Sequence, residues 1–148
     1  MAPVDPRLTI ARRLVRAGGV VLGLLGLAHL AATPHIPALI GGLRGTPDYA
    51  WALGPTLLNH VLVGLLLLPL GLSTWIAADG AHIGQGWARG LLAANTLAVL
   101  ALPVSLVVFM RGGAYYSSPL FVTGVGLVAV ASLLMALAVG WLLTRRAG

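Results

Sequence analysis

The chain of 148 residues is 59% hydrophobic and only 8% charged, and its mean hydropathy is +0.99. Soluble globular domains contain about a quarter charged residues, so this composition excludes an ordinary soluble domain and indicates an integral membrane protein. The net charge of +6 does not indicate nucleic-acid binding, because all the basic residues are arginines and most flank hydrophobic stretches, where they act as topology signals. Without cysteine, the chain has no disulfides, thiolate metal sites or iron–sulfur clusters.

The first hydrophobic stretch predicts a membrane-spanning helix over about residues 8–32, with arginines at its start. It ends at Thr33-Pro34, because proline cannot continue a helix. A basic flank followed by an apolar run is also typical of a secretory signal peptide. The spacing of Gly19 and Gly23 favours a helix-packing interface instead, because small residues let helices approach closely in a membrane.

A long loop follows, in which Thr46 as cap and Pro47 at a first helical position predict a short interfacial helix. Gly54-Pro55 is expected to break that helix and to open the second span. Continuous apolar sequence predicts the second, third and fourth spans at about residues 55–78, 87–110 and 119–143. A short polar connection over 79–86 separates the second span from the third.

Together these segments predict an all-α integral membrane protein whose single domain, residues 1–148, is a four-transmembrane-helix bundle. Pro69 and Pro103 fall inside the second and third spans and are expected to kink them. Lipid is therefore the expected surrounding of most of the chain.

Arginine counts predict the orientation of the bundle. Seven arginines lie near the two termini or the connection between the second and third spans, and two lie on the other side. The seven are Arg7, Arg12, Arg13, Arg16, Arg89, Arg145 and Arg146, and the two are Arg44 and Arg111. Arginine is in excess on the cytoplasmic side of membranes, so both termini are predicted to be cytoplasmic. The absence of Lys and Glu suggests a GC-rich bacterial gene, hence the bacterial cytoplasmic (inner) membrane.

Small residues predict the faces through which the helices pack. At about 100° per residue, one face of the second span carries His60, Gly64, Leu67, Gly71 and Thr74. The third span has a second small-residue face, formed by Gly90, Ala94, Ala98, Ala101 and Ser105, with Asn95 at its border. Gly64 and Gly71 are therefore predicted to be packing residues, and Asn95 an interhelical hydrogen-bonding residue.

One group of residues has the chemistry of a binding site. His29 lies about one turn before the first span ends, and His60 about one turn after the second begins, so antiparallel helices place both at similar depth. His35 and Asp48 lie in the connecting loop on the same side of the membrane. Imidazole suits Zn, Cu, Fe and Ni, and two histidines on adjacent helices also hold haem. The segment therefore predicts a redox-linked protein that holds a transition metal, a haem or a quinone through His29 and His60, with His35 or Asp48 assisting.

The sequence leaves other interpretations open. His29 and His60 can simply hydrogen-bond within the bundle, as polar residues in membranes often do. The protein can then be a non-catalytic accessory subunit of a larger membrane complex, or a small-molecule carrier that uses Pro69 and Pro103 as gates. No carboxylate lies well inside a span, which disfavours an ion-coupled pump. Whether the protein catalyses any reaction is left open.

Overall fold

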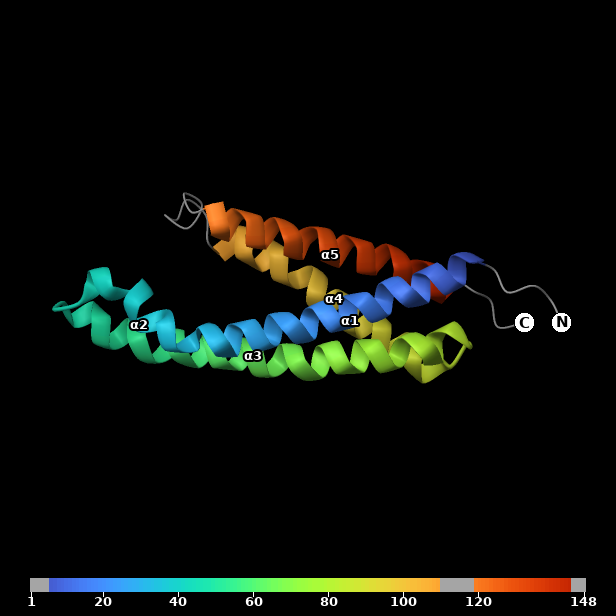
Figure 1. Cartoon of the computed structure of the whole chain (residues 1–148), viewed down its shortest axis with the longest axis horizontal. Coiled ribbons are helices and arrows are strands. Elements are labelled where there is room, and N and C mark those ends of the chain that lie inside the picture. Colours follow the sequence, from blue (N-terminus) through green and yellow to red (C-terminus); the bar gives the residue numbers. More distant parts are fainter. Residues whose placement is uncertain (1–5, 110–118, 145–148) are drawn as a thin grey trace. The chain divides into compact units, whose positions relative to one another are not determined.

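The computed structural model describes residues 6–109 and 119–144, and within these ranges the chain is helical throughout apart from short turns (Figure 1). The four long helices are α1 (Pro6–Ala32), α3 (Pro47–His82), α4 (Gly86–Phe109) and α5 (Pro119–Thr144). A short helix, α2 (Ile36–Leu39), lies between two 3-10 turns, Thr33–His35 and Gly41–Leu43. The predicted all-α bundle of four helices is confirmed.

Among the described residues, three helical stretches are long and apolar enough to cross a membrane, namely Pro6–Leu43, Pro47–His82 and Gly86–Phe109. The apolar stretch of α5 found among the described residues, Val128–Thr144, is shorter. The chain is thus a multi-helix, multi-pass membrane protein whose apolar helix surfaces contact lipid. The connection after α4, including Arg111, lies outside the described residues, as do Arg145 and Arg146.

The prediction of a separate interfacial helix before the second span is wrong. The helix that begins at Pro47 continues through Gly54 and Pro55 without a break and forms the first turns of α3. Proline in a helix removes a single N–H donor, and Pro55 is exposed. At 1.5 Å per residue α3 is about 54 Å long, against about 30 Å for the hydrocarbon core of a bilayer. Helix α3 is therefore longer than the hydrocarbon core is thick.

The predicted polar connection over 79–86 is also mostly helical. Helix α3 continues to His82 and α4 begins at Gly86. The end of α3 is a Schellman motif, in which the N–H of Gly84 donates to the carbonyl of Ala81 at 3.1 Å and that of Gln85 to the carbonyl of Gly80 at 2.8 Å. Gly84 has φ +89°, a left-handed conformation that favours glycine, and this permits the tight turn.

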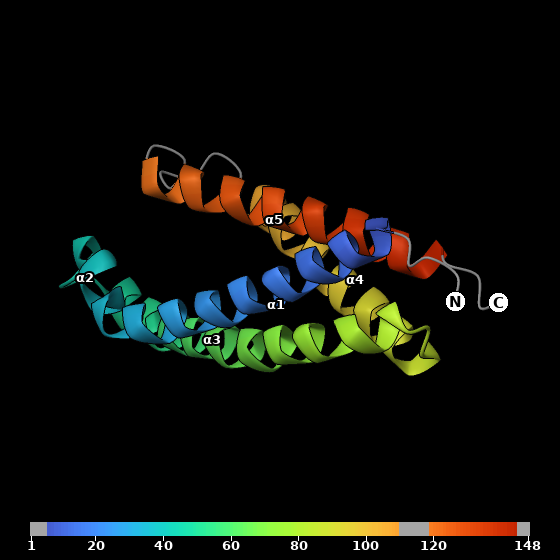
Figure 2. The same cartoon turned by 45° about the vertical axis from the view of Figure 1, so that its right-hand side comes forward.

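The chain consists of two compact units, residues 1–18 with 73–148 and residues 19–72. In the second unit, α1 from residue 19 onward lies antiparallel to the first part of α3, as both views show (Figure 1, Figure 2). The first unit contains α4, α5 and the remaining ends of α1 and α3. Its core holds the largest fully buried side chains of the described residues, Leu92, Leu142, Val15, Val139, Thr74 and Ser132.

Helix α4 packs through a different face from the one predicted. Its buried residues are Ala88, Leu92, Asn95, Thr96 and Val99. The predicted small-residue face, from Gly90 to Ser105, is exposed in this chain. Pro103 lies inside the helix and cannot donate to the carbonyl of Val99, four residues earlier. The Oγ of Ser132 lies 3.5 Å from that carbonyl and 2.6 Å from the carbonyl of Val128, so α5 places a hydroxyl beside the freed acceptor.

Candidate functional site

Glycines set the register between α1 and α3 in the unit formed by residues 19–72. A Cβ built on Gly71 would lie 2.5 Å from the carbonyl oxygen of Gly19, and one built on Gly26 would lie 2.8 Å from that of Gly64. The two backbones are therefore in direct contact at both positions, as small residues permit in membranes. Seven residues separate the two contacts on each helix, so the antiparallel register is constant between them.

This register brings His29 and His60 together at the end of the glycine contact. His29 lies three residues after Gly26 on α1, and His60 four residues before Gly64 on α3. The ring centroids are 4.8 Å apart and the ring planes make an angle of 33°. Both residues are half-buried. The two imidazoles predicted from the sequence thus lie in contact, one from each helix.

Backbone carbonyls hold both rings by the same nitrogen. His29 Nδ1 lies 3.0 Å from the carbonyl oxygen of Leu25, and His60 Nδ1 lies 3.0 Å from the carbonyl oxygen of His29. Thr33 Oγ1 donates to the same His29 carbonyl at 2.9 Å. Because a carbonyl oxygen can only accept, Nδ1 of each ring is the donor. In the neutral tautomer this leaves the lone pair of each Nε2 for another partner.

The spacing of the rings determines which metal geometry they can serve. With a metal–nitrogen bond of about 2 Å and about 1 Å more to the ring centre, two imidazoles on opposite sides of an ion have centroids about 6 Å apart. By the same construction, two imidazoles at adjacent positions have centroids about 5 Å apart on a tetrahedral ion and about 4 Å apart on a square-planar ion. The observed 4.8 Å therefore fits adjacent positions on a tetrahedral ion. It is too short for an axial pair across a haem.

The other predicted site residues are not part of this contact. His35 ends the 3-10 turn after α1, Asp48 lies in the first turn of α3, and both are exposed. Within residues 6–109 and 119–144, no group of three or more His, Asp or Glu side chains is close enough to hold a metal ion together. The structure brings His29 and His60 together and leaves His35 and Asp48 apart from them.

Asn95 forms a separate polar contact in the other unit. Its Nδ2 donates to Ser73 Oγ and to Thr74 Oγ1, each at 2.9 Å, and thereby joins α4 to α3. The side chain is buried. The neighbouring Thr96 Oγ1 is also buried and has no hydrogen-bond partner among the described residues. These contacts have the geometry expected of an interhelical hydrogen bond.

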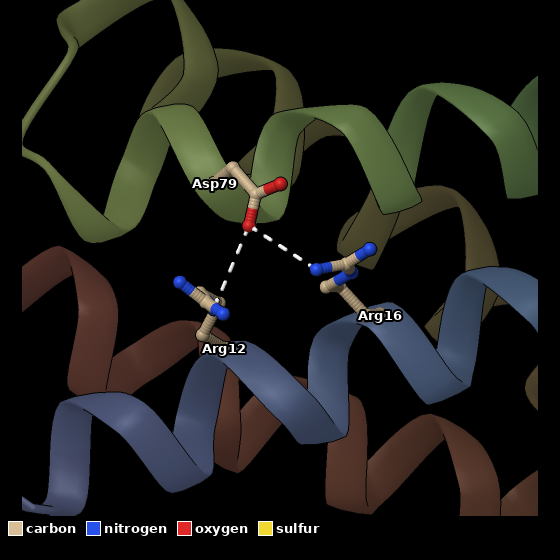
Figure 3. Close-up of polar contacts among 3 residues, drawn as sticks. All are labelled: Arg12, Arg16 and Asp79. Atoms are coloured by element: carbon tan, nitrogen blue, oxygen red, sulfur yellow. Dashed lines mark ion pairs between the residues drawn. The ribbon is translucent and has the colours of Figure 1, made fainter.

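Sequence reasoning missed an ionic cluster near the turn between α3 and α4. Asp79 Oδ1 lies 3.5 Å from Arg12 Nε and 3.7 Å from Arg16 Nη1 (Figure 3). The Arg16 guanidinium lies 4.3 Å from the centre of the Trp75 ring. The arginines were interpreted only as topology signals and Asp79 as a loop residue. Their spacing was nevertheless informative, because residues four apart share one face of a helix.

Comparison with protein-family models, with curated proteins and with solved structures finds no match to this chain.

Proposed function

We propose that this membrane protein binds a transition-metal ion through Nε2 of His29 and Nε2 of His60. The observation that carries the proposal is the anchoring of both Nδ1 atoms by backbone carbonyls, with the rings 4.8 Å apart. Histidines that bind metals almost always donate their other N–H to a carbonyl, a carboxylate or water, which fixes the tautomer and orients the ring. Both rings have this arrangement, and they belong to different helices.

The same geometry selects among the ligand classes that the sequence suggested. A neutral ring that donates through Nδ1 offers a lone pair at Nε2, which suits a metal ion and not the carbonyl oxygen of a quinone, since that oxygen is itself an acceptor. The ring spacing disfavours a haem held by both histidines. Imidazole nitrogen suits Zn, Cu, Ni and Fe. A redox role follows only if the ion is copper or iron.

Two imidazoles supply half of a four-coordinate shell, so the remaining positions are for water, substrate or further side chains. His35 and Asp48 belong to the segment around the connection between α1 and α3, next to the ends of the helices that carry the pair. The proposed centre is therefore an open one, and we assign these two residues an assisting role.

The orientation of the bundle belongs to the same proposal: both termini in the cytoplasm and the histidine pair toward the extracytoplasmic face of a bacterial inner membrane. Reporter fusions or cysteine accessibility should place Gly45, before α3, outside and Gly84, between α3 and α4, inside. The reason is the excess of arginine around the termini and the second connection. An inside location for Gly45 would overturn the orientation and the extracytoplasmic position of the site.

The metal proposal is tested on protein purified in detergent with a tag that contains no histidine. Elemental analysis and titration with Zn²⁺, Cu²⁺ and Co²⁺ should give about one ion per chain, because the site has one pair of rings. The d–d absorption of bound Co²⁺ should shift from that of the hydrated ion as nitrogen replaces water. His82→Gln is the matched control and should keep this stoichiometry, since His82 belongs to the unit that does not contain the pair. No binding above that of a denatured sample would contradict the proposal.

An accessory-subunit role is the second candidate, favoured by the exposed small residues of α4 from Gly90 to Ser105. Small residues on a lipid-facing surface allow another helix to approach closely. This candidate predicts that a larger membrane protein co-purifies in mild detergent and that the isolated chain contains no metal. The metal proposal instead predicts that the isolated chain contains bound metal.

A further inference from the structure

Two arginines share one carboxylate oxygen near the end of α3. Arg12 and Arg16 lie one turn apart on α1, and both ion pairs end on Oδ1 of Asp79 (Figure 3). All three side chains belong to the unit that contains residues 1–18 and 73–148. The side chains are a third to a half exposed, at 36% and 33% for the arginines and 50% for Asp79, whereas the paired atoms Arg12 Nε and Asp79 Oδ1 are buried. A ligand would therefore approach the outer parts of the two guanidinium groups.

Asp79 cannot satisfy both guanidinium groups. The nitrogen–oxygen distances of 3.5 and 3.7 Å exceed the 2.7–2.9 Å of a charge-assisted hydrogen bond. Each guanidinium carries five N–H donors, and each ion pair uses a single nitrogen. Two positive groups against one negative group leave an excess charge of one. The cluster therefore has both the charge and the donors to bind a further anion.

The cluster also holds its donors in a fixed arrangement. Trp75, one turn before Asp79 on α3, lies beneath the Arg16 guanidinium at 4.3 Å from the ring centre, a cation–π contact. Arg16 is thus held between an aromatic face and a carboxylate. Tryptophan is enriched at membrane interfaces, where phosphate headgroups lie. A guanidinium held in this way loses little freedom when it binds an anion.

A second observation at the same turn points to an anion. Arg89 lies in the first turn of α4, directly after the connection that follows α3. Its Nε and Nη2 are buried and have no hydrogen-bond partner within the part of the chain that the structure describes. Buried donors are normally satisfied. Buried guanidinium donors without a hydrogen-bond partner among the described residues therefore occur in the cluster itself, at Arg12 Nε, and on α4, at Arg89.

We propose that Arg12 and Arg16 bind a phosphate group at this end of the bundle, with Asp79 and Trp75 holding the two guanidinium groups in position. Guanidinium matches phosphate oxygens in geometry, and basic pockets between membrane helices bind anionic headgroups. The phosphate can come from an anionic phospholipid or from free phosphate. This site is distinct from the histidine pair, which belongs to the other unit.

Native mass spectrometry of the full chain in detergent, with added phosphatidylglycerol or phosphatidylcholine, tests the proposal. Wild-type protein should retain phosphatidylglycerol in preference, and Arg12→Gln or Arg16→Gln should each weaken that retention about fivefold. Arg13→Gln is the matched control, since Arg13 is exposed and forms no ion pair with the described residues. It should change retention less than twofold. Equal weakening by the Arg13 and Arg12 variants would show only a diffuse basic surface and would overturn the site.

Two further experiments identify the source of the phosphate and keep the proposal testable if a variant misfolds. Competition of phosphatidylglycerol by inorganic phosphate shows that the phosphate group alone is bound, and retention without competition shows that the lipid is the ligand. Either result supports the site, whereas equal retention of the two lipids with no effect of phosphate rejects it. If a glutamine variant does not fold, Arg12→Lys and Arg13→Lys replace the pair. Only the former should weaken retention, because lysine keeps the charge and loses the fork of donors.

Discussion

Gly71→Ala is expected to destabilise the protein by about 3 kcal/mol, the upper end of typical overpacking effects. The added methyl group would lie 2.5 Å from the carbonyl oxygen of Gly19 and 2.7 Å from the backbone nitrogen of Gly23. These are backbone atoms of α1, which cannot move aside as the end of a side chain can. The helices must separate, and the contacts along residues 19–72 are lost with them. Unfolding of the detergent-solubilised protein with increasing dodecyl sulfate measures the change.

Gly23→Ala is the control for that experiment, because a Cβ at Gly23 would meet nothing within 4 Å. It should be neutral or stabilising by up to about 1 kcal/mol, since alanine favours a helix more than glycine does. Gly64→Ala should lie between the two, because one of its close contacts is the movable side chain of Leu30, at 2.7 Å. Equal stability of the Gly71 and Gly23 variants would mean that the two backbones are not in contact.

The packing face of α3 could be predicted from the sequence because helical periodicity and small residue size both select the same side of this helix. Gly64, Leu67, Gly71 and Thr74 are buried, and Leu66 on the opposite side is 67% exposed. In α4 the two criteria disagree. Its small residues are exposed, and the buried face combines Leu92 and Val99 with polar residues. Residue size alone therefore chose the wrong side of α4.

Helix boundaries were predicted less well, because proline and glycine were treated as they act in water. Gly54-Pro55 was expected to end a helix, yet α3 runs through it. A helix in or near lipid keeps its hydrogen bonds because an exposed backbone group there costs several kcal/mol. At the C-terminal end of α3, several glycines were candidates for the residue that ends the helix. The left-handed Gly84 ends α3, whereas Gly80 lies within the helix.

The meeting of His29 and His60 was predicted partly for the wrong reason. Their equal depth was inferred from two helix boundaries, and the one at Pro55 does not exist. They meet because the glycine contacts fix the register of the two helices. The orientation of each ring through Nδ1 could not be predicted, since it depends on carbonyls whose positions the sequence does not give. The Asp79 cluster was missed because the end of α3 was taken for a loop.

His29→Gln and His60→Gln are each expected to lower metal affinity about 100-fold or more, since even the loss of a group that merely orients a ligand costs 10–100-fold. Each substitution removes one of only two imidazole nitrogens, and the glutamine amide is a poor ligand for a borderline metal. The two variants should lose binding equally, because neither ring alone chelates the ion. Titration with Co²⁺ or Zn²⁺, in parallel with His82→Gln, measures the loss.

The glutamine variants should lose metal affinity while their folding stability changes little. This combination is expected of metal ligands, whereas residues with a purely structural role would lose stability. The amide of glutamine at position 60 can still donate to the His29 carbonyl, which also accepts from Thr33 Oγ1. The hydrogen bond of His29 stays within its own helix. Changes in unfolding free energy should therefore remain below about 1 kcal/mol, as for other hydrogen bonds in membranes.

His60→Leu removes the hydrogen-bond donor and should lower the free energy of unfolding more than His29→Leu does. The reason is that the hydrogen bond of His60 runs between the two helices, whereas that of His29 stays within α1. If both glutamine variants keep wild-type metal content, the rings are hydrogen-bonding groups alone and the metal proposal fails.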